Sequence, residues 1–316
     1  MTNRLSPIPI GRPTFLDAPR CADLDTLDAH IAVLGLPICV PYNLDYATRA
    51  AGAPQAIRDQ SLRYVPGYLE RYDFDFGGEL LAGKDVKIVD CGDVALVPGQ
   101  WEQNSRNATA VVKAILDRGA VPIVLGGEHS ITIPVIRAYE GRGPMCMVHV
   151  DAHIDWRDEV NGVREGLSSP MRRASEMPWI KGMAQVGIRG IGSARREEFE
   201  AARKYGSVLI GAEELHRVGV EGILDRIPSA ERYYISFDAD GLDPAIAPAV
   251  MGPAPGGVTY YEATNLFRAV ARKGRVVGLD FVEVLPSLDV HNLTSRLAVR
   301  LILNLIGALA HAGQLG

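Results

Sequence analysis

The chain has 316 residues and a mass of 34.2 kDa, with 47% hydrophobic and 22% charged residues. These values are typical of globular proteins and exclude disordered, collagen-like and low-complexity chains. The formal net charge of −5 disfavours a nucleic-acid partner, because such proteins usually carry a basic face. It is compatible with a small cationic substrate.

Short runs rich in Val, Ile and Leu recur along the chain and are predicted to be strands. They lie at 29–37, 86–93, 121–127, 145–153, 183–189, 232–240 and 275–284. Runs that are apolar on both faces are typical of parallel strands covered by helices on each side. Segments with helical spacing lie at 103–118, 195–205, 261–273 and 293–310. The alternation predicts a doubly wound α/β fold and, without linkers or repeats, a single domain over 1–316.

The cysteines and the N-terminal residues indicate the cellular compartment of the protein. None of the cysteines forms a C-x-x-C pair, which favours free thiols in a reducing environment: Cys21, Cys39, Cys91 and Cys146. The first fifteen residues lack the apolar core of a secretory signal. We expect no run of about 20 apolar residues that would span a bilayer. The sequence therefore predicts a cytoplasmic protein with no membrane partner.

Four of the apolar runs end in acidic or imidazole side chains. Ligands of open parallel sheets bind just beyond the carboxyl ends of the strands, so we expect these residues to converge on one edge. Within a strand end, side chains at i, i+2 and i+4 share a face, which is the spacing in D-A-H-I-D at 151–155 and in D-A-D at 238–240. The residues concerned are His129, Asp151, His153, Asp155, Asp238, Asp240 and Glu283.

Five carboxylates crowded into one crevice repel each other strongly, and divalent cations relieve that cost. Asp and His ligands without thiolates suit Mn²⁺, Ni²⁺, Co²⁺ or Zn²⁺. Six side chains are candidate ligands: His129, Asp151, His153, Asp155, Asp238 and Asp240. If two carboxylates bridge, the site holds two metals and lowers the pKa of a bridging water toward about 7.

Simpler explanations compete at individual positions. A single aspartate at a strand end is more often a helix cap or turn former than a ligand. His149 is two positions before Asp151 and therefore points to the same face of the strand. It lies inside the predicted strand, however, so we interpret it as a core or supporting histidine. Asp243 is either a support for the site or a turn cap. Gly126 and Gly127 are predicted to turn the chain through positive φ.

Several segments resemble the signature segments of the ureohydrolase superfamily, which comprises arginases, agmatinases and guanidino-acid hydrolases. They are GGEHS at 126–130, DAHID at 151–155, SFDADGLDP at 236–244 and EVLP at 283–286. The agreement extends through 49–58, 89–94 and 253–257, and the agmatinase-like branch fits best. The resemblance implies a three-layer α/β/α sandwich around a parallel sheet of roughly eight strands. It also implies homotrimers or homohexamers with two Mn²⁺ ions, or Ni²⁺ as in some relatives.

The resemblance assigns roles to the matching residues. One metal would be held by His129, Asp151, Asp155 and Asp238. The other would be held by Asp151, His153, Asp238 and Asp240, so that Asp151 and Asp238 bridge. Glu283 matches the acid that binds the substrate guanidinium. A planar guanidinium can donate two parallel hydrogen bonds to a carboxylate. Asp155 would pass a proton to the leaving amine, and hydrolysis would yield urea and an amine or ammonia.

Two positions depart from the family pattern. Glu128 stands where an aspartate is common, a change that would alter orientation without removing a ligand. Leu167 stands where members such as guanidinobutyrases carry a histidine regarded as a proton shuttle or substrate contact. One hypothesis is an active enzyme whose more apolar mouth favours small or alkylated guanidines. The alternative is a metal-binding, weakly active partner subunit of a heteromeric ureohydrolase.

The loop after the D-A-H-I-D segment supplies two more candidates for substrate binding. Trp156 would wall the pocket or pack in the core. Arg157 would meet a substrate carboxylate or pair with Asp158 or Glu159 at the surface. Binuclear metallophosphatases are a rival class, but they would need further His ligands and cationic groups for phosphate. Agmatine, 4-guanidinobutyrate, 3-guanidinopropionate, guanidine and methylated guanidines all remain candidate substrates.

Overall fold

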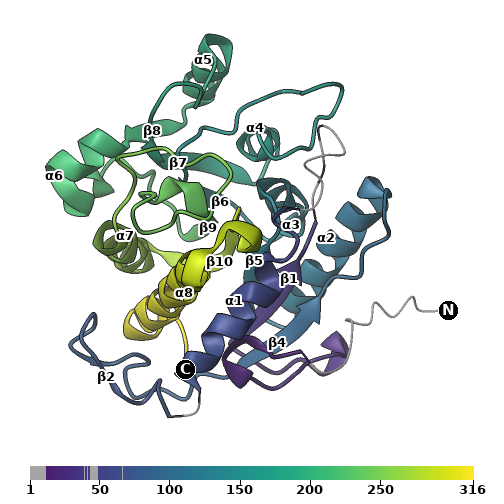
Figure 1. Ribbon diagram of the computed structural model, residues 1–316, viewed down its shortest axis with the longest axis vertical. Helices are drawn as coiled ribbons and strands as arrows, with labels where there is room; N and C mark the ends of the chain where they lie inside the picture. Colours follow the sequence, from purple (N-terminus) through teal and green to yellow (C-terminus); the bar gives the residue numbers. More distant parts are fainter. Residues whose placement is uncertain (1–11, 39, 41, 43–48, 66) are drawn as a thin grey trace.

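The computed structural model describes residues 12–38, 40, 42, 49–65 and 67–316, so Cys39 lies outside the described residues. Its centre is an eight-stranded sheet in the order β4-β1-β5-β10-β9-β6-β7-β8, with all pairs parallel (Figure 1). The strands are β1 Ile31–Leu36, β4 Ile88–Asp93, β5 Val121–Gly126, β6 Met145–Val150, β7 Ile180–Ile188, β8 Val208–Gly211, β9 Arg232–Asp238 and β10 Arg275–Val282. The seven predicted runs each overlap a strand of this sheet, and β7 begins three residues earlier than its predicted run. The sequence reading missed only β8 among the strands of this sheet, because it is four residues long.

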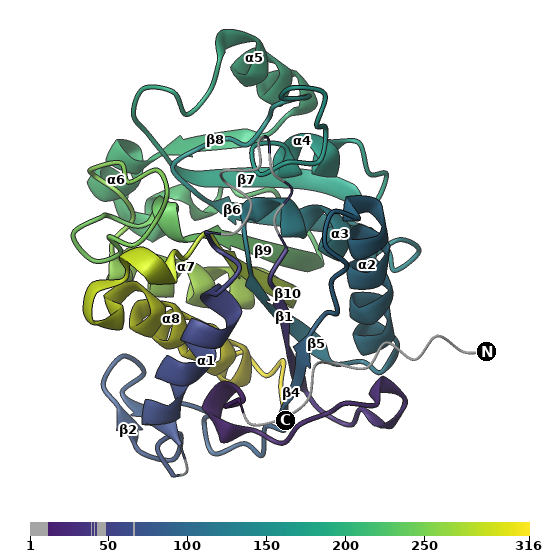
Figure 2. The same cartoon turned by 45° about the vertical axis from the view of Figure 1, so that its right-hand side comes forward.

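Helices cover both faces of the sheet (Figure 2). One layer contains α1 Ala53–Ser61, α6 Ala212–Leu224, α7 Tyr260–Lys273 and α8 Leu293–His311. The other contains α2 Trp101–Asp117, α3 Thr132–Arg137 and α4 Pro170–Ser175, and α5 Arg196–Tyr205 lies near β8. A two-stranded hairpin is formed by β2 Tyr72–Asp73 and β3 Gly78–Glu79. The predicted three-layer α/β/α architecture is confirmed.

The alternation of side chains along each strand builds two cores. In β1, Ile31 and Val33 belong to the core under α1 and α8, whereas Ala32 and Leu34 belong to the core under α2 and α3. All four side chains are buried, as expected for a parallel strand between two helical layers. The sheet is therefore anchored on both faces, and the loops beyond its carboxyl edge start from fixed positions.

The expectation of no membrane-length apolar segment needs correction. The segment 290–311, a 3-10 turn at 290–292 followed by α8, is long and apolar enough by composition to cross a bilayer. However, 78% of its apolar window is buried inside the fold, where α8 packs against α1 and α7. Its apolar character is explained by this packing, because a helix that is covered on most sides needs few polar positions.

Candidate metal centre and active site

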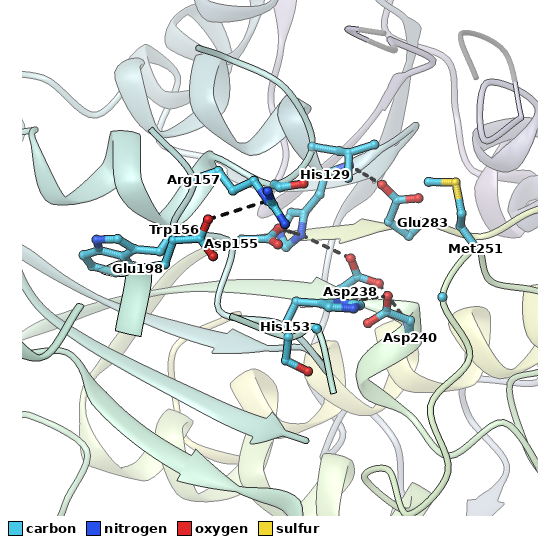
Figure 3. A pocket seen from close by; sticks show the side chains of 15 residues that line it. His129, His153, Asp155, Trp156, Arg157, Glu198, Asp238, Asp240, Met251 and Glu283 are labelled. Carbon is cyan, nitrogen blue, oxygen red and sulfur yellow. Dashed lines mark hydrogen bonds and ion pairs between the residues drawn. The ribbon is translucent and has the colours of Figure 1, made fainter. Parts of the chain in front are cut away.

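The site lies where four neighbouring strands end. The strands that precede the predicted ligands are β5, β10, β9 and β6, and these are consecutive at the centre of the sheet. Their carboxyl ends therefore bring together side chains that are more than 150 positions apart in the chain. Figure 3 shows His129, His153, Asp155, Asp238, Asp240 and Glu283 around one cavity.

His129 opens a 3-10 turn, His129–Ile131, directly after β5. Its Nδ1 lies 2.8 Å from Asp155 Oδ2, 3.1 Å from Asp238 Oδ2 and 3.3 Å from Asp151 Oδ2. Its Nε2 lies 2.9 Å from Ser236 Oγ, and Ser236 donates its own hydrogen to Asp280 at 2.7 Å. Ser236 Oγ must therefore accept from Nε2, which leaves the Nδ1 lone pair directed at the carboxylates.

A second group of ligand atoms surrounds His153. Its Nδ1 lies 3.1 Å from Asp151 Oδ1 and 3.2 Å from Asp240 Oδ2. Asp240 is held by the turn Ala239–Gly241, where its backbone N–H donates to Asp238 Oδ1 at 2.8 Å. Asp151 thus faces both histidines, with one oxygen toward each.

Asp155 and Glu283 have backbones in the left-handed region, with φ of 49° and 65°. Residues other than glycine rarely adopt this conformation, and it recurs at functional sites. The carbonyl of Asp155 accepts the N–H groups of Met171 and Arg172 in the first turn of α4, which holds the loop in place. Glu283 Oε1 accepts the N–H of His129 at 2.8 Å. The other oxygen, Oε2, is buried without a partner among the described residues.

The electrostatics of the cluster are those of crowded carboxylates. Burial and the neighbouring carboxylates of Asp240 and Asp151 raise the pKa of Asp238 well above its usual range. Burial and the charge of Asp151 raise the pKa of Asp240 to about 6. Burial lowers the pKa of His153, but hydrogen bonds with Asp151 and Asp240 outweigh it and raise that pKa to about 12. Such a cluster favours positive charge among its carboxylates.

The residues present fit divalent metal ions. Two groups have ligand atoms within 4.8 Å of one another: His129 with His149, Asp151 and Asp155, and Asp151 with His153 and Asp240. Asp151 belongs to both. Among the described residues, His129 Nδ1 and Asp151 Oδ2 are buried without an aligned hydrogen bond, although oxygens and nitrogens lie close by. Buried polar atoms normally have a partner, so these two atoms are available to a bound metal ion.

The two glycines before His129 are needed for a reason other than the predicted one. Neither Gly126 nor Gly127 has positive φ. A Cβ on Gly127 would lie 2.3 Å from the carbonyl oxygen of Ile38 and 2.7 Å from that of Leu36. A Cβ on Gly126 would lie 2.6 Å from Val282. Close packing of strand ends, rather than turn conformation, therefore requires glycine here.

The cavity has a volume of about 260 Å³ and reaches outward from the cluster. Leu167 and Met251 line it, as do all three residues of the loop Asp155, Trp156 and Arg157. Trp156 is 2% exposed, and its ring packs against Tyr205 with 5.7 Å between centroids. Arg157 pairs with neither Asp158 nor Glu159; its Nε lies 3.7 Å from Glu198 Oε1 on α5 (Figure 3).

Three positions that the sequence left open are now placed. Glu128 lies outside the ligand groups; its Oε1 accepts the N–H of Val40 at 2.6 Å and the hydroxyl of Ser130. Asp243 caps a turn, since its Oδ2 accepts the N–H groups of Gly256 and Gly257. His149 is fully buried and enters the cluster, with its Nε2 2.9 Å from Asp151 Oδ2.

The sequence reading missed Arg189, which organises the turn that carries Asp240. Its guanidinium makes six hydrogen bonds to the carbonyl oxygens of Gly187, Asp240, Gly241, Leu242 and Ala254. These bonds join the turn after β9 to the loop that contains Met251. An arginine after a strand has no sequence signal for this role, because its partners are backbone atoms from distant segments.

The comparisons with known proteins agree with this geometry. The sequence profile of the arginase family matches residues 29–307. The chain belongs to the arginase family. Among its relatives in the family, N(1)-aminopropylagmatine ureohydrolase of Thermus thermophilus is 34% identical, over 90% of this chain and 92% of its own. Guanidinobutyrase of Pseudomonas aeruginosa is 32% identical, over 90% and 87%.

The solved structure of proclavaminate amidinohydrolase from Streptomyces clavuligerus is similar along nearly the whole chain. Its TM-score is 0.82 at 30% identity, covering 98% of this chain and 100% of that one. The prediction of an agmatinase-like ureohydrolase is confirmed. The protein is an amidinohydrolase that cleaves guanidino compounds, and its His/Asp cluster is a site for divalent metal ions.

Proposed function

We propose that the cluster is a site for two divalent ions and that Asp151 and Asp238 would be ligands of both. The other ligands would be His129 and Asp155 for one ion, and His153 and Asp240 for the second. The proposal is supported by the three carboxylate oxygens within 3.3 Å of His129 Nδ1 and by the two that lie within 3.2 Å of His153 Nδ1. When bound, the ions would activate a water molecule for hydrolysis of the guanidino group by lowering its pKa.

Glu283 would bind the substrate guanidinium. Its Oε1 accepts the N–H of His129, and its Oε2 is buried and unpartnered among the described residues. The residue lines the cavity. A planar guanidinium donates two parallel hydrogen bonds to a carboxylate in this setting. Asp155 would move the proton to the leaving amine, because its carboxylate lies at the cavity wall, within 2.8 Å of His129 Nδ1.

The outer part of the cavity bears on which guanidino compound is cleaved. Glu198 Oε1 lies 3.7 Å from Arg157 Nε and 4.0 Å from Arg195 Nε, so one carboxylate faces two guanidinium groups. Among the described residues, the Nη groups of Arg157 have no hydrogen-bond partner, and its side chain is 25% exposed. The Arg157 guanidinium at the outer cavity wall repels an ammonium tail and attracts a carboxylate.

The substrate we infer is therefore a short guanidino compound with an anionic or uncharged tail, such as 4-guanidinobutyrate, 3-guanidinopropionate or an alkylguanidine. The observation that carries this inference is Arg157 at the cavity wall beside the apolar side chains of Leu167 and Met251. Trp156 would close the wall behind Arg157. The alternative hypothesis is a weakly active partner subunit. Such a subunit would have no need to keep costly buried polar ligands, so the intact cluster disfavours this alternative.

The experiment is urea release by the single purified chain from a panel of these compounds and agmatine, after reconstitution with Mn²⁺ or Ni²⁺. We expect guanidino acids or alkylguanidines to exceed agmatine at least tenfold in kcat/KM. Arg157→Gln should reduce the preference for acids over uncharged guanidines about tenfold, and Leu167→His should raise agmatine turnover. Agmatine turnover equal to that of the acids would refute the specificity argument, and no urea from any compound would refute the activity.

The metal identity and the assembly are also proposals. Mn²⁺ is the expected ion and Ni²⁺ the alternative, because the same Asp and His ligands serve both. We propose a cytoplasmic homotrimer or homohexamer of one domain over 1–316. The buried thiols of Cys21, Cys91 and Cys146 are free, which supports a reducing compartment. Elemental analysis of protein purified without chelators and light scattering of the purified chain would test the ion and the assembly.

A further inference from the structure

His149 lies within the metal cluster, yet none of the proposed ligand roles uses it. The residue sits on β6 two positions before Asp151 and is fully buried. Its ring lies 5.1 Å from the ring of His129 between centroids. Its Nε2 is 2.9 Å from Asp151 Oδ2, and among the described residues neither atom has an aligned hydrogen bond. His149 Nε2 and Asp151 Oδ2 are therefore two buried polar atoms in contact, each without an aligned partner.

The opposite ring nitrogen is oriented by Gln185 on the neighbouring strand β7. The amide nitrogen of Gln185 lies 2.7 Å from the carbonyl oxygen of Ile154 and 3.0 Å from His149 Nδ1. The amide oxygen accepts the hydroxyl of Ser207 at 2.9 Å. A carbonyl can only accept, so the NH₂ group must face Ile154 and also His149.

This orientation decides the tautomer of His149. An amide N–H directed at Nδ1 requires a lone pair there, because two N–H groups would otherwise face each other at 3.0 Å. The ring hydrogen is then on Nε2, the atom that faces Asp151 Oδ2. A nitrogen that carries a hydrogen has no lone pair for a metal ion. His149 Nε2 is thus close enough to the other ligand atoms to bind a metal ion, but in this tautomer it carries a hydrogen and cannot do so.

We propose that His149 is a positioning residue that donates from Nε2 to Asp151, and that Gln185 sets it in this tautomer. The donated hydrogen bond holds the carboxylate that bridges the two ions in one orientation. This inference rests on the proposed bridging role of Asp151. Partners of this kind around metal ligands typically contribute about 10–100-fold to metal affinity.

The test is Mn²⁺ binding, measured by chelator competition and by the EPR signal of a coupled Mn²⁺ pair, with circular dichroism as a check of folding. His149→Phe keeps an aromatic ring but removes the donor, and should weaken the second Mn²⁺ about 10–100-fold while the capacity stays at two ions. His149→Gln places an amide N–H near the position of Nε2 and should remain within about threefold of the parent protein.

Each outcome decides the inference. Unchanged Mn²⁺ affinity in folded His149→Phe overturns it, and so does loss of one whole ion in both variants, which would make His149 a direct ligand. If His149→Phe does not fold, Gln185→Met takes its place. We expect a weakening of about tenfold for Gln185→Met, and an unchanged affinity overturns the inference. A parent protein that binds no Mn²⁺ or Ni²⁺ would instead refute the proposed metal assignment.

Discussion

Replacing Arg189 with methionine should loosen the turn that carries Asp240. The side chain is half-buried and makes six hydrogen bonds to five carbonyl oxygens. A hydrogen bond from a charged donor contributes about 1.5–3 kcal/mol, but water replaces part of the loss at a half-exposed position. We therefore expect the free energy of unfolding to fall by about 3 kcal/mol. For a chain of this length, that lowers Tm by about 5 °C.

The effect on the site should exceed the effect on stability. Arg189 binds the carbonyl of Asp240 itself at 2.7 Å, so its loss lets this proposed ligand move. We expect Mn²⁺ affinity and kcat each to fall about tenfold in Arg189→Met, measured by chelator competition and urea release. Arg189→Lys has at most three donors and should be intermediate.

Arg232 offers a matched control, because it is also half-buried and binds the carbonyls of Arg142 and Gly143 at the other end of β9. Arg232→Met should lower Tm without changing Mn²⁺ affinity or kcat. If Arg189→Met retains both Mn²⁺ affinity and kcat, or if Arg232→Met loses them equally, the positioning role assigned to Arg189 is wrong.

Three other substitutions probe separate features. Glu283→Gln should raise KM about 100-fold by removing a buried charge worth about 3 kcal/mol to the guanidinium; metal content measured by elemental analysis should not change, and an unchanged KM would contradict the role. Gly127→Ala should cost about 3 kcal/mol in urea unfolding because of the backbone contact at 2.3 Å, whereas Gly78→Ala, with nothing within 4 Å, should be neutral. Burial lowers the pKa of His216, but the hydrogen bond with Glu262 outweighs it and raises that pKa above 6.5. Its stabilisation is therefore full below pH 6.5 and lost as pH rises through the raised value. In Glu262→Gln the His216 pKa measured by NMR should fall toward 6.5, and no change would contradict this account.

The strands and the carboxylate cluster could be predicted because they obey local rules. Apolar runs mark buried parallel strands, and acids spaced by two at a strand end must share a face, as in D-A-H-I-D at 151–155. For His149 the sequence offered a core or a supporting role, and the structure places the side chain in contact with Asp151. The adjacency of β5, β10, β9 and β6 is not visible in the sequence, because it depends on crossover connections.

The supporting residues could not be predicted for the same reason. Gln185, Ser236 and Arg189 act on the site through partners that only the folded sheet brings near. The partner of Arg157 is Glu198, which is 41 positions further along on α5, whereas the sequence offered the adjacent Asp158 and Glu159. The glycines at 126 and 127 were recognised as necessary, but the reason, backbone crowding, needs coordinates.

The position of the site at the centre of the sheet determines how metal ions exchange and how products are released. Each of the four strands beneath the cluster has a hydrogen-bonded neighbour on both edges, and none is an edge strand. Fraying begins at elements with few partners, so the backbone under the cluster opens only when the whole sheet opens. Metal ions and products must therefore enter and leave through the mouth of the cavity, because the floor stays closed.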